Sequence, residues 1–155
     1  NNITRLLESR DIPYKAFELP QDKLSAQETA DILQVPLSLI YKSIVAERKS
    51  GGKWILAVVP GDREVDTSAL AKAAGEKKIT IASQKTAERE TGLKVGGISP
   101  LAWVNRGFDI FIDSSSLDHD QIHVSGGEPG INIRLPVKAL IELTGAGVAI
   151  ISRPI

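Results

Sequence analysis

The chain has 155 residues, of which 42% are hydrophobic, and its 19 basic residues balance its 19 acidic ones, so its formal net charge is zero. This length and composition fit one domain over residues 1–155. The chain has no cysteine, which excludes a thiolate enzyme and a Cys-ligated zinc or iron–sulfur site, and no apolar run approaches the roughly 20 residues that span a bilayer.

In the first half of the chain, apolar periodicity and capping residues predict helices that alternate with strands. In chain order we expect a helix from Ile3 to about Arg10, a strand from Tyr14 to Phe17, a helix from the capping pair Ser25 and Glu28 to Leu33, a turn from Pro36 to Ile40, and a hairpin of Ile44–Val45 and Trp54–Val59 around Gly51-Gly52.

The second half continues in the same way. We expect helices over Thr67–Ala74, Gln84–Thr91 and Val137–Thr144, with strands over Ile79–Ile81, Asp109–Asp113, Gln121–Val124, Ile131–Leu135 and Val148–Ile151. The predicted fold class is therefore α+β, with a mixed, mostly antiparallel sheet flanked by helices and with the hairpin near its centre.

Two glycine-rich loops are candidate binding elements. They are Gly96-Gly97-Ile98-Ser99-Pro100 and Ser125-Gly126-Gly127. Each places two glycines beside a serine, so backbone N–H groups can approach an anion or an oxyanion with no Cβ in the way. Hairpin turns need glycine as well, so a purely structural role stays open.

Lys42 is a candidate cation for the same site. It lies at a strand entry and has the parity of Ile44 and Ala46. If those residues point inward, the strand carries an ammonium group toward the interior, where it would be a counter-charge for a phosphate or a developing oxyanion. The alternative is an ordinary surface lysine whose stem covers apolar surface.

Three other patterns suggest different functions, and each has a simpler explanation. Asp118, His119, His123 and Ser125 supply the residue types of a hydrolase triad, but such residues fall close together by chance in most proteins and suit a polar turn. His119, Asp120 and His123 supply those of a metal site, but their i, i+4 spacing suits a helix, whereas this stretch is predicted to be turn and strand. The segment from Ser25 to Ile44 is similar to a helix-turn-helix, which would indicate a DNA-binding regulator. Its would-be recognition helix, Pro36 to Tyr41, is nearly all apolar, which argues against groove reading and favours helix packing.

The charges are distributed unevenly. Residues 1–37 carry four bases and six acids, residues 38–106 twelve bases and seven acids, and residues 107–155 three bases and six acids. The middle block could make a weak, salt-sensitive contact with a polyanion, but charge alone favours a surface of solvated lysines.

Taken in order, four segments resemble the YbaK/ProX family, the free-standing relatives of the editing domain of bacterial prolyl-tRNA synthetase. They are residues 40–45 (IYKSIV), 58–66 (VVPGDREVD), 96–101 (GGISPL) and 124–127 (VSGG). The resemblance implies an α+β fold and a hydrolase that deacylates mischarged tRNA, typically cysteine or alanine on proline tRNA. We expect no cofactor and no metal, and we expect a cytoplasmic location because no charged-then-apolar leader opens the sequence. The resemblance also implies prolyl-tRNA synthetase as a partner; a non-catalytic tRNA-binding adaptor is an alternative.

The family's motifs assign roles to residues of this chain. The implied catalytic residues are Lys42, Gly97, Ser99, Ser125 and Gly127, and the implied substrate-binding residues are Leu19, Tyr41, Ser43, Gly96, Ile98, Pro100, Gly126 and Asn132. The sequence departs from the family pattern at Ser43, Asn132, Ala102 and Leu19, where threonine, aspartate, glycine and tyrosine are common. We expect Lys42 and the N–H groups of Gly97 and Gly127 to stabilise charge, while the ribose hydroxyl or a cysteinyl thiol of the substrate assists attack.

Overall fold

The computed structural model describes residues 1–20, 24–103 and 107–155. The α-helices are α1 (Asn2–Ser9), α2 (Ala26–Leu33), α3 (Thr67–Ala74), α4 (Gln84–Thr91) and α5 (Val137–Thr144), and the 3-10 helices are η1 (Leu37–Leu39), η2 (Pro100–Trp103) and η3 (Ser114–Asp118). The strands are β1 (Lys15–Glu18), β2 (Tyr41–Arg48), β3 (Trp54–Pro60), β4 (Arg63–Val65), β5 (Ile79–Ile81), β6 (Phe108–Asp113), β7 (Gln121–Ser125), β8 (Ile131–Pro136), β9 (Gly147–Ala149) and β10 (Ser152–Pro154).

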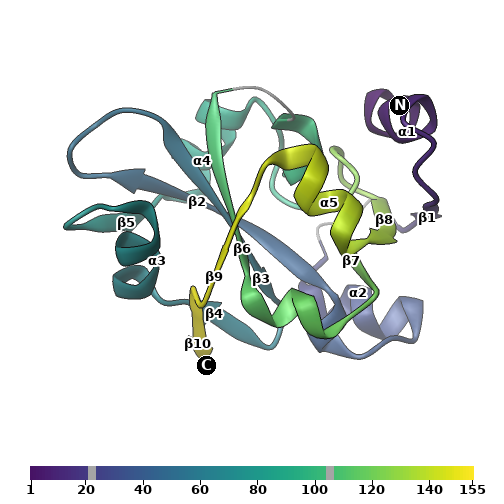
Figure 1. Ribbon diagram of the computed structural model, residues 1–155. Helices are drawn as coiled ribbons and strands as arrows, with labels where there is room; N and C mark the ends of the chain where they lie inside the picture. Colours follow the sequence, from purple (N-terminus) through teal and green to yellow (C-terminus); the bar gives the residue numbers. More distant parts are fainter. Residues whose placement is uncertain (21–23, 104–106) are drawn as a thin grey trace.

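Within these ranges the strands form a five-stranded sheet of order β5-β2-β3-β6-β9, a three-stranded sheet of order β1-β8-β7, and the pair β4-β10. The pairings β3·β6 and β6·β9 are parallel, and the other strand pairs are antiparallel. The predicted α+β class with a mixed, mostly antiparallel sheet is confirmed, and so is the central position of the β2–β3 hairpin. The three-stranded sheet lies at the end of the molecule that carries α1 and α2, away from α3 and β5 (Figure 1).

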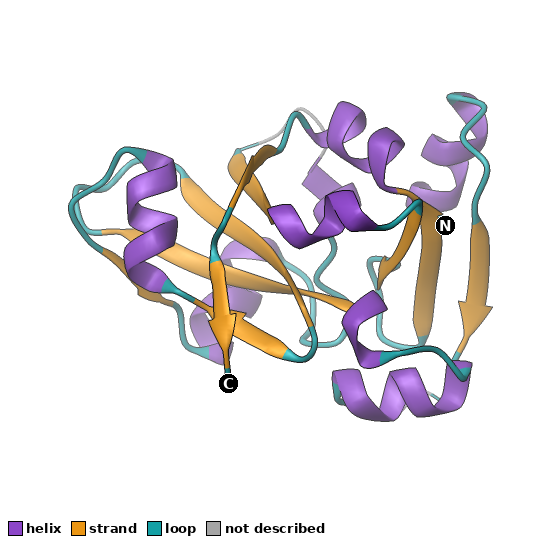
Figure 2. Ribbon diagram, turned by 60° about the horizontal axis from the view of Figure 1, so that its bottom comes forward, coloured by secondary structure: helices purple, strands orange, loops and turns teal. Residues whose placement is uncertain are grey.

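Both faces of the five-stranded sheet are buried, which explains why β3 is an almost continuous apolar run. Leu56 and Val58 pack with the apolar residues of β7, β8 and α5, whereas Ala57 and Val59 pack toward α3. Figure 2 shows the two sheets as separate groups of strands with helices around them. Among the described residues, no helix is both long enough and apolar enough to cross a membrane.

The predicted helix ends are set by the capping side chains. The Ser25 Oγ accepts the N–H of Glu28 at 3.1 Å, and a Glu28 carboxylate oxygen accepts the N–H of Ser25 at 3.0 Å, which completes the capping box. Asp66 and Ser83 cap α3 and α4 in the same position. These local signals act within four residues, so the sequence alone is sufficient to predict them.

The predicted last strand over Val148–Ile151 is wrong in its extent. The structure ends β9 at Ala149 and starts β10 at Ser152, because the Ile151 N–H is donated to the Asp113 carboxylate at 3.0 Å. The Ile151 carbonyl then accepts the Asp66 N–H at 2.8 Å, and the chain leaves β6 to pair with β4. Strand β4 and the 3-10 helices η2 and η3 were not predicted.

The helix-turn-helix interpretation is also wrong. After α2 the chain forms only the 3-10 turn η1 and then enters β2 directly. The segment therefore offers no second helix of a length that could lie in a DNA groove, and the DNA-binding regulator has no structural basis.

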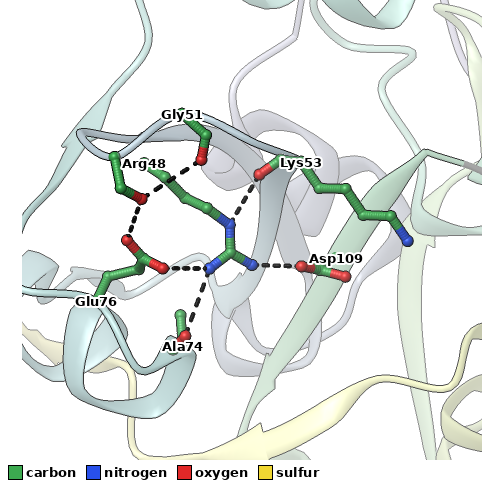
Figure 3. Close-up of polar contacts among 7 residues, drawn as sticks. Arg48, Gly51, Lys53, Ala74, Glu76 and Asp109 are labelled. Carbon is green, nitrogen blue, oxygen red and sulfur yellow. Dashed lines mark hydrogen bonds and ion pairs between the residues drawn. The ribbon is translucent and has the colours of Figure 1, made fainter.

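Arg48 ties the β2–β3 hairpin to α3 and β6 (Figure 3). Its guanidinium donates to the carbonyl of Lys53 at 2.9 Å, to a Glu76 carboxylate oxygen at 3.1 Å, and to the carboxylate of Asp109. Ser50 also donates to Glu76 at 2.6 Å. A planar guanidinium satisfies all of these acceptors from one position, which a lysine ammonium cannot do.

We expect Arg48→Met to lower the midpoint of thermal unfolding by several degrees, because it removes the donor that holds three elements together, takes the guanidinium away from the Asp109 carboxylate and leaves Glu76 with Ser50 as its donor. Arg153→Met is the matched control, since its ion pair with Glu64 is exposed and contributes little. Circular dichroism melts of both variants check this, and equal midpoints would contradict it.

Candidate functional site

A cavity of about 330 Å³ opens between the two sheets. Its walls come from α2, β2, the start of α4, the loop before η2 and the β7–β8 turn. The predicted site residues that line it are Lys42, Ser125, Leu19, Tyr41, Ser43, Gly96, Ile98 and Asn132. Residues of three of the four motifs, 40–45, 96–101 and 124–127, therefore meet at one place, whereas no residue of the motif at 58–66 is among the lining residues.

The edge of β2 forms one side of this cavity. Strand β5 pairs with β2 only at Ala46–Arg48, and the Val45 carbonyl accepts the Ala82 N–H at 2.9 Å. Because alternate residues of a strand direct their backbone groups to the same side, the N–H and C=O of Ser43 point the same way as the Val45 carbonyl. The Ser43 Oγ is buried without a hydrogen-bond partner in the part of the chain that the structure describes. Ser43 thus brings backbone polar groups to the cavity, while its Oγ is buried.

Lys42 is the charged residue of the cavity. Among the described lining residues there is no carboxylate and no other cation. Burial lowers the pKa of Lys42, while the nearby carboxylates of Glu64 and Asp62 act in the opposite direction. The ammonium is half-buried, and it can act as a counter-charge for an oxyanion more strongly than it could in bulk water.

Tyr41 contributes its ring to the cavity wall, but its hydroxyl is engaged elsewhere. The hydroxyl lies 2.8 Å from the Ser115 Oγ of η3. Burial raises the pKa of Tyr41 to about 12. The phenol therefore stays protonated and shapes the cavity without acting as an acid or a base.

The two glycine loops pack against each other. The Ser125 hydroxyl donates to the Gly96 carbonyl at 3.0 Å. A Cβ on Gly97 would lie 2.7 Å from the Glu128 Cα and 2.8 Å from its carbonyl carbon, so only glycine allows this approach. The loops form a common wall.

The structure corrects the roles expected of two glycines. The N–H of Gly97 is donated to the Lys94 carbonyl at 2.8 Å, so it is not available to an oxyanion. Gly127 lies against Ile3 and lines a second cavity, of about 430 Å³, on the other side of the loop, together with Gly126. Its position does not fit an oxyanion donor in the first cavity.

Ser99 and Pro100 lie behind the cavity wall. Ser99 is fully buried, and its Oγ accepts the Leu101 N–H at 3.2 Å at the start of η2. The structure thus gives Ser99 a capping role that fixes the loop, and Pro100 is buried beside it.

No hydrolase triad forms from the predicted histidines. The Nδ1 of His123 lies 2.7 Å from the Asn132 Oδ1, and the Ser125 hydroxyl is bound to Gly96. Within the ranges that the structure describes, no three His, Asp or Glu side chains gather as metal ligands. The pair of His123 and Asn132 was missed, although the β7–β8 hairpin pattern places these residues diagonally across the two strands.

Burial lowers the pKa of His123 below its ordinary value of 6.5; the hydrogen bond to Asn132 raises the pKa in part, and Arg134 lowers it further. The unfolded chain therefore binds a proton at a higher pH than the folded protein does. We expect the free energy of unfolding to fall as the pH drops from about 7 to about 5, and to fall less in His123→Leu.

Urea unfolding at several pH values checks this slope. His119→Gln is the matched control and should keep the slope of the unmodified protein. Identical slopes for the unmodified protein and His123→Leu would contradict the prediction.

A family model for the aminoacyl-tRNA editing domain matches residues 21–143. The chain belongs to this family. The editing domain is 34% identical to a candidate Cys-tRNA(Pro)/Cys-tRNA(Cys) deacylase, EbsC, of Enterococcus faecalis over 92% of this chain and 87% of that protein. It is 27% identical to the proline–tRNA ligase of Staphylococcus aureus strain Newman, over 78% of this chain and 20% of the ligase.

A solved structure of a candidate trans-editing enzyme for prolyl-tRNA synthetase matches the editing domain with a TM-score of 0.81 and 27% identity, over 97% of this chain and 96% of that one. The resemblance inferred from the four motifs is therefore confirmed at the level of family and fold.

Proposed function

We propose that the protein is a trans-editing deacylase that hydrolyses the ester between a small, wrongly attached amino acid and the 3′-terminal ribose of tRNA. The proposed substrates are cysteine or alanine on proline tRNA. The observation that carries the proposal is the cavity, whose lining includes the half-buried Lys42 and a part of β2 that has no strand partner on its β5 side among the described residues. The names of the similar proteins support the same substrate class.

The lining residues favour stabilisation of charge over proton abstraction. A water molecule attacks the ester carbonyl carbon and gives up the proton that later reaches the leaving ribose oxygen; the carbonyl oxygen becomes an oxyanion, and the Lys42 ammonium stabilises it. The ester bond to the ribose oxygen then breaks, and that oxygen takes up a proton. No carboxylate or imidazole lines the described part of the cavity, so we assign assistance of the attack to the substrate's own ribose hydroxyl or cysteinyl thiol.

The size of the cavity supports a small amino acid. Its volume of about 330 Å³ lies near the lower end of the range of about 300–1,000 Å³ for small-molecule sites. Most of its side chains are aliphatic, among them Ile44, Ala87 and Ile98. Such a wall distinguishes ligands that differ by one methylene by only about 1–3 kcal/mol, which is the reason that synthetases for small residues need separate editing.

The proposed partner is a prolyl-tRNA synthetase that presents the tRNA. The chain carries no net charge, whereas a protein that holds tRNA unaided depends on neutralising many phosphates. Capture of the tRNA by the synthetase would compensate for this weak electrostatic attraction.

Incubation with Cys-, Ala- and Pro-tRNA(Pro) tests the proposal. We expect Cys-tRNA(Pro) or Ala-tRNA(Pro) to lose its ester well above the buffer rate, and Pro-tRNA(Pro) to stay intact, because the cavity selects by size. Radiolabelled amino acid that stays acid-precipitable reports the remaining ester. If micromolar protein releases none, the enzyme is rejected; a shift of tRNA in a native gel would then favour a non-catalytic adaptor.

A further inference from the structure

The cavity wall contains a side-chain amide that is held by a buried imidazole. Asn132 lines the cavity and is 5% exposed, and His123 is 2% exposed. The His123 Nδ1 lies 2.7 Å from the Asn132 Oδ1. His123 itself does not line the cavity, so it reaches the site only through Asn132.

The chemistry of this contact fixes both partners. The structure turns the Asn132 Oδ1 toward the ring, and an amide oxygen only accepts hydrogen bonds, so in this orientation the His123 Nδ1 carries the proton and donates it. The Asn132 Oδ1 is thereby occupied, and the Nδ2, which carries two N–H donors, is the half of the amide left for the cavity. An amide rotated by 180° would present an acceptor to the cavity instead, and it would require the other tautomer, in which the unprotonated His123 Nδ1 accepts from the Asn132 Nδ2.

The neighbours of His123 keep the ring in place. The Phe17 ring packs against the imidazole with centroids 5.7 Å apart, and the Arg134 guanidinium carbon lies 5.7 Å from the centroid of Phe17. These residues belong to adjacent strands of the β1-β8-β7 sheet. Burial and the Arg134 charge both hold the pKa of His123 down, so the ring is a neutral donor at pH 7.

We propose that His123 is a positioning residue that fixes Asn132 as a hydrogen-bond donor toward the aminoacyl end of the substrate. The cavity then offers the Asn132 amide N–H groups and the Lys42 ammonium to a ligand that is rich in oxygen acceptors, as an aminoacyl ester with its ribose hydroxyls is. This inference rests on the proposed deacylase function for its substrate, but the orientation of the pair does not depend on it.

The tautomer of His123 is measured directly by ¹⁵N NMR of the imidazole nitrogens at neutral pH. The chain has two histidines, so the spectrum of His119→Gln identifies the signals of His123. We expect a protonated Nδ1 and an unprotonated Nε2. The opposite tautomer would mean that Asn132 donates to His123, and it would overturn the proposal whether or not the protein hydrolyses an ester.

Kinetics on the mischarged tRNA that the unmodified protein cleaves test the functional consequence. His123→Asn keeps an N–H donor close to the position of Nδ1, and His123→Leu does not. We expect His123→Leu to lower kcat/KM about tenfold and His123→Asn to restore most of the loss, because one directed hydrogen bond is affected. His119→Gln should leave the rate unchanged.

A double-mutant cycle separates positioning from a general loss of structure. If His123 acts through Asn132, the double variant His123→Leu/Asn132→Leu should be no slower than Asn132→Leu alone. Losses that multiply, or a His123→Leu rate equal to that of the unmodified protein, would overturn the positioning role. If the unmodified protein cleaves no aminoacyl ester, the proposed function fails, and the tautomer decides the orientation of the pair by itself.

Discussion

Replacement of Lys42 by alanine is expected to abolish deacylation while the protein stays folded. Lys42 supplies the charge of the cavity wall, and loss of one preorganised group that stabilises an oxyanion slows catalysis by about 10²- to 10³-fold. Lys42→Arg should not restore the rate, because a planar guanidinium has a different shape and hydrogen-bond geometry. Single-turnover assays on Cys- or Ala-tRNA(Pro) measure the effect.

The fold should tolerate this change. Burial lowers the pKa of Lys42, which means that the folded state disfavours the ammonium, so its removal relieves a desolvation cost. The midpoint of thermal unfolding should therefore stay the same or rise. Lys53→Ala, on the β2–β3 hairpin and exposed, is the control. A Lys42→Ala protein that keeps its rate would show that the residue is not catalytic.

Gly97→Ala is expected to lower both stability and activity. The new Cβ would lie 2.7 Å from the Cα of Glu128, and a backbone atom cannot rotate away as a side chain can. The two loops must separate, which for an overpacked interior costs about 1–3 kcal/mol. Displacement of the cavity wall by about 1 Å can slow a positioned reaction by about 10²-fold.

Urea unfolding and deacylation assays of the same preparation measure both effects. Gly107→Ala is the control, because a Cβ there has open space and the residue does not have a positive φ. If Gly97→Ala equals Gly107→Ala in both assays, the contact between the loops is not what shapes the cavity.

The boundaries of the helices were predictable because each depends on residues a few positions apart. Asp66 and Gly75 flank α3, and their roles are a side-chain cap and a left-handed φ of 71°. The end of β9 was not predictable, because it depends on the bond from Ile151 to Asp113, which is formed only in the folded chain.

In the candidate site, too, some features were predictable from the sequence and others depend on contacts that form only in the folded chain. Motif order and the resemblance predicted that Lys42 and the two loops converge, and the structure places them around a common wall. The motifs could not predict that the Gly97 N–H donates its hydrogen bond to the Lys94 carbonyl. A loop glycine is equally suited to a backbone N–H that is free and to one that is already hydrogen-bonded. The sequence predicts that Asn132 binds substrate, but it does not reveal His123 as the partner of Asn132, because that contact depends on the register of β7 on β8 in the folded chain.

The pairing of β1 with β8 determines how early in the synthesis of the chain the complete cavity can form. Lys15 faces Arg134 across these strands, and Leu19, which follows β1, shares the cavity with Asn132 of β8. During synthesis on the ribosome β1 is made early, but it can pair only after β8 has been made. Domains with such distant pairings fold slowly. A nascent or prematurely terminated chain that lacks β8 therefore also lacks the cavity wall that contains Ile131 and Asn132, so the cavity is complete only after β8 has been made.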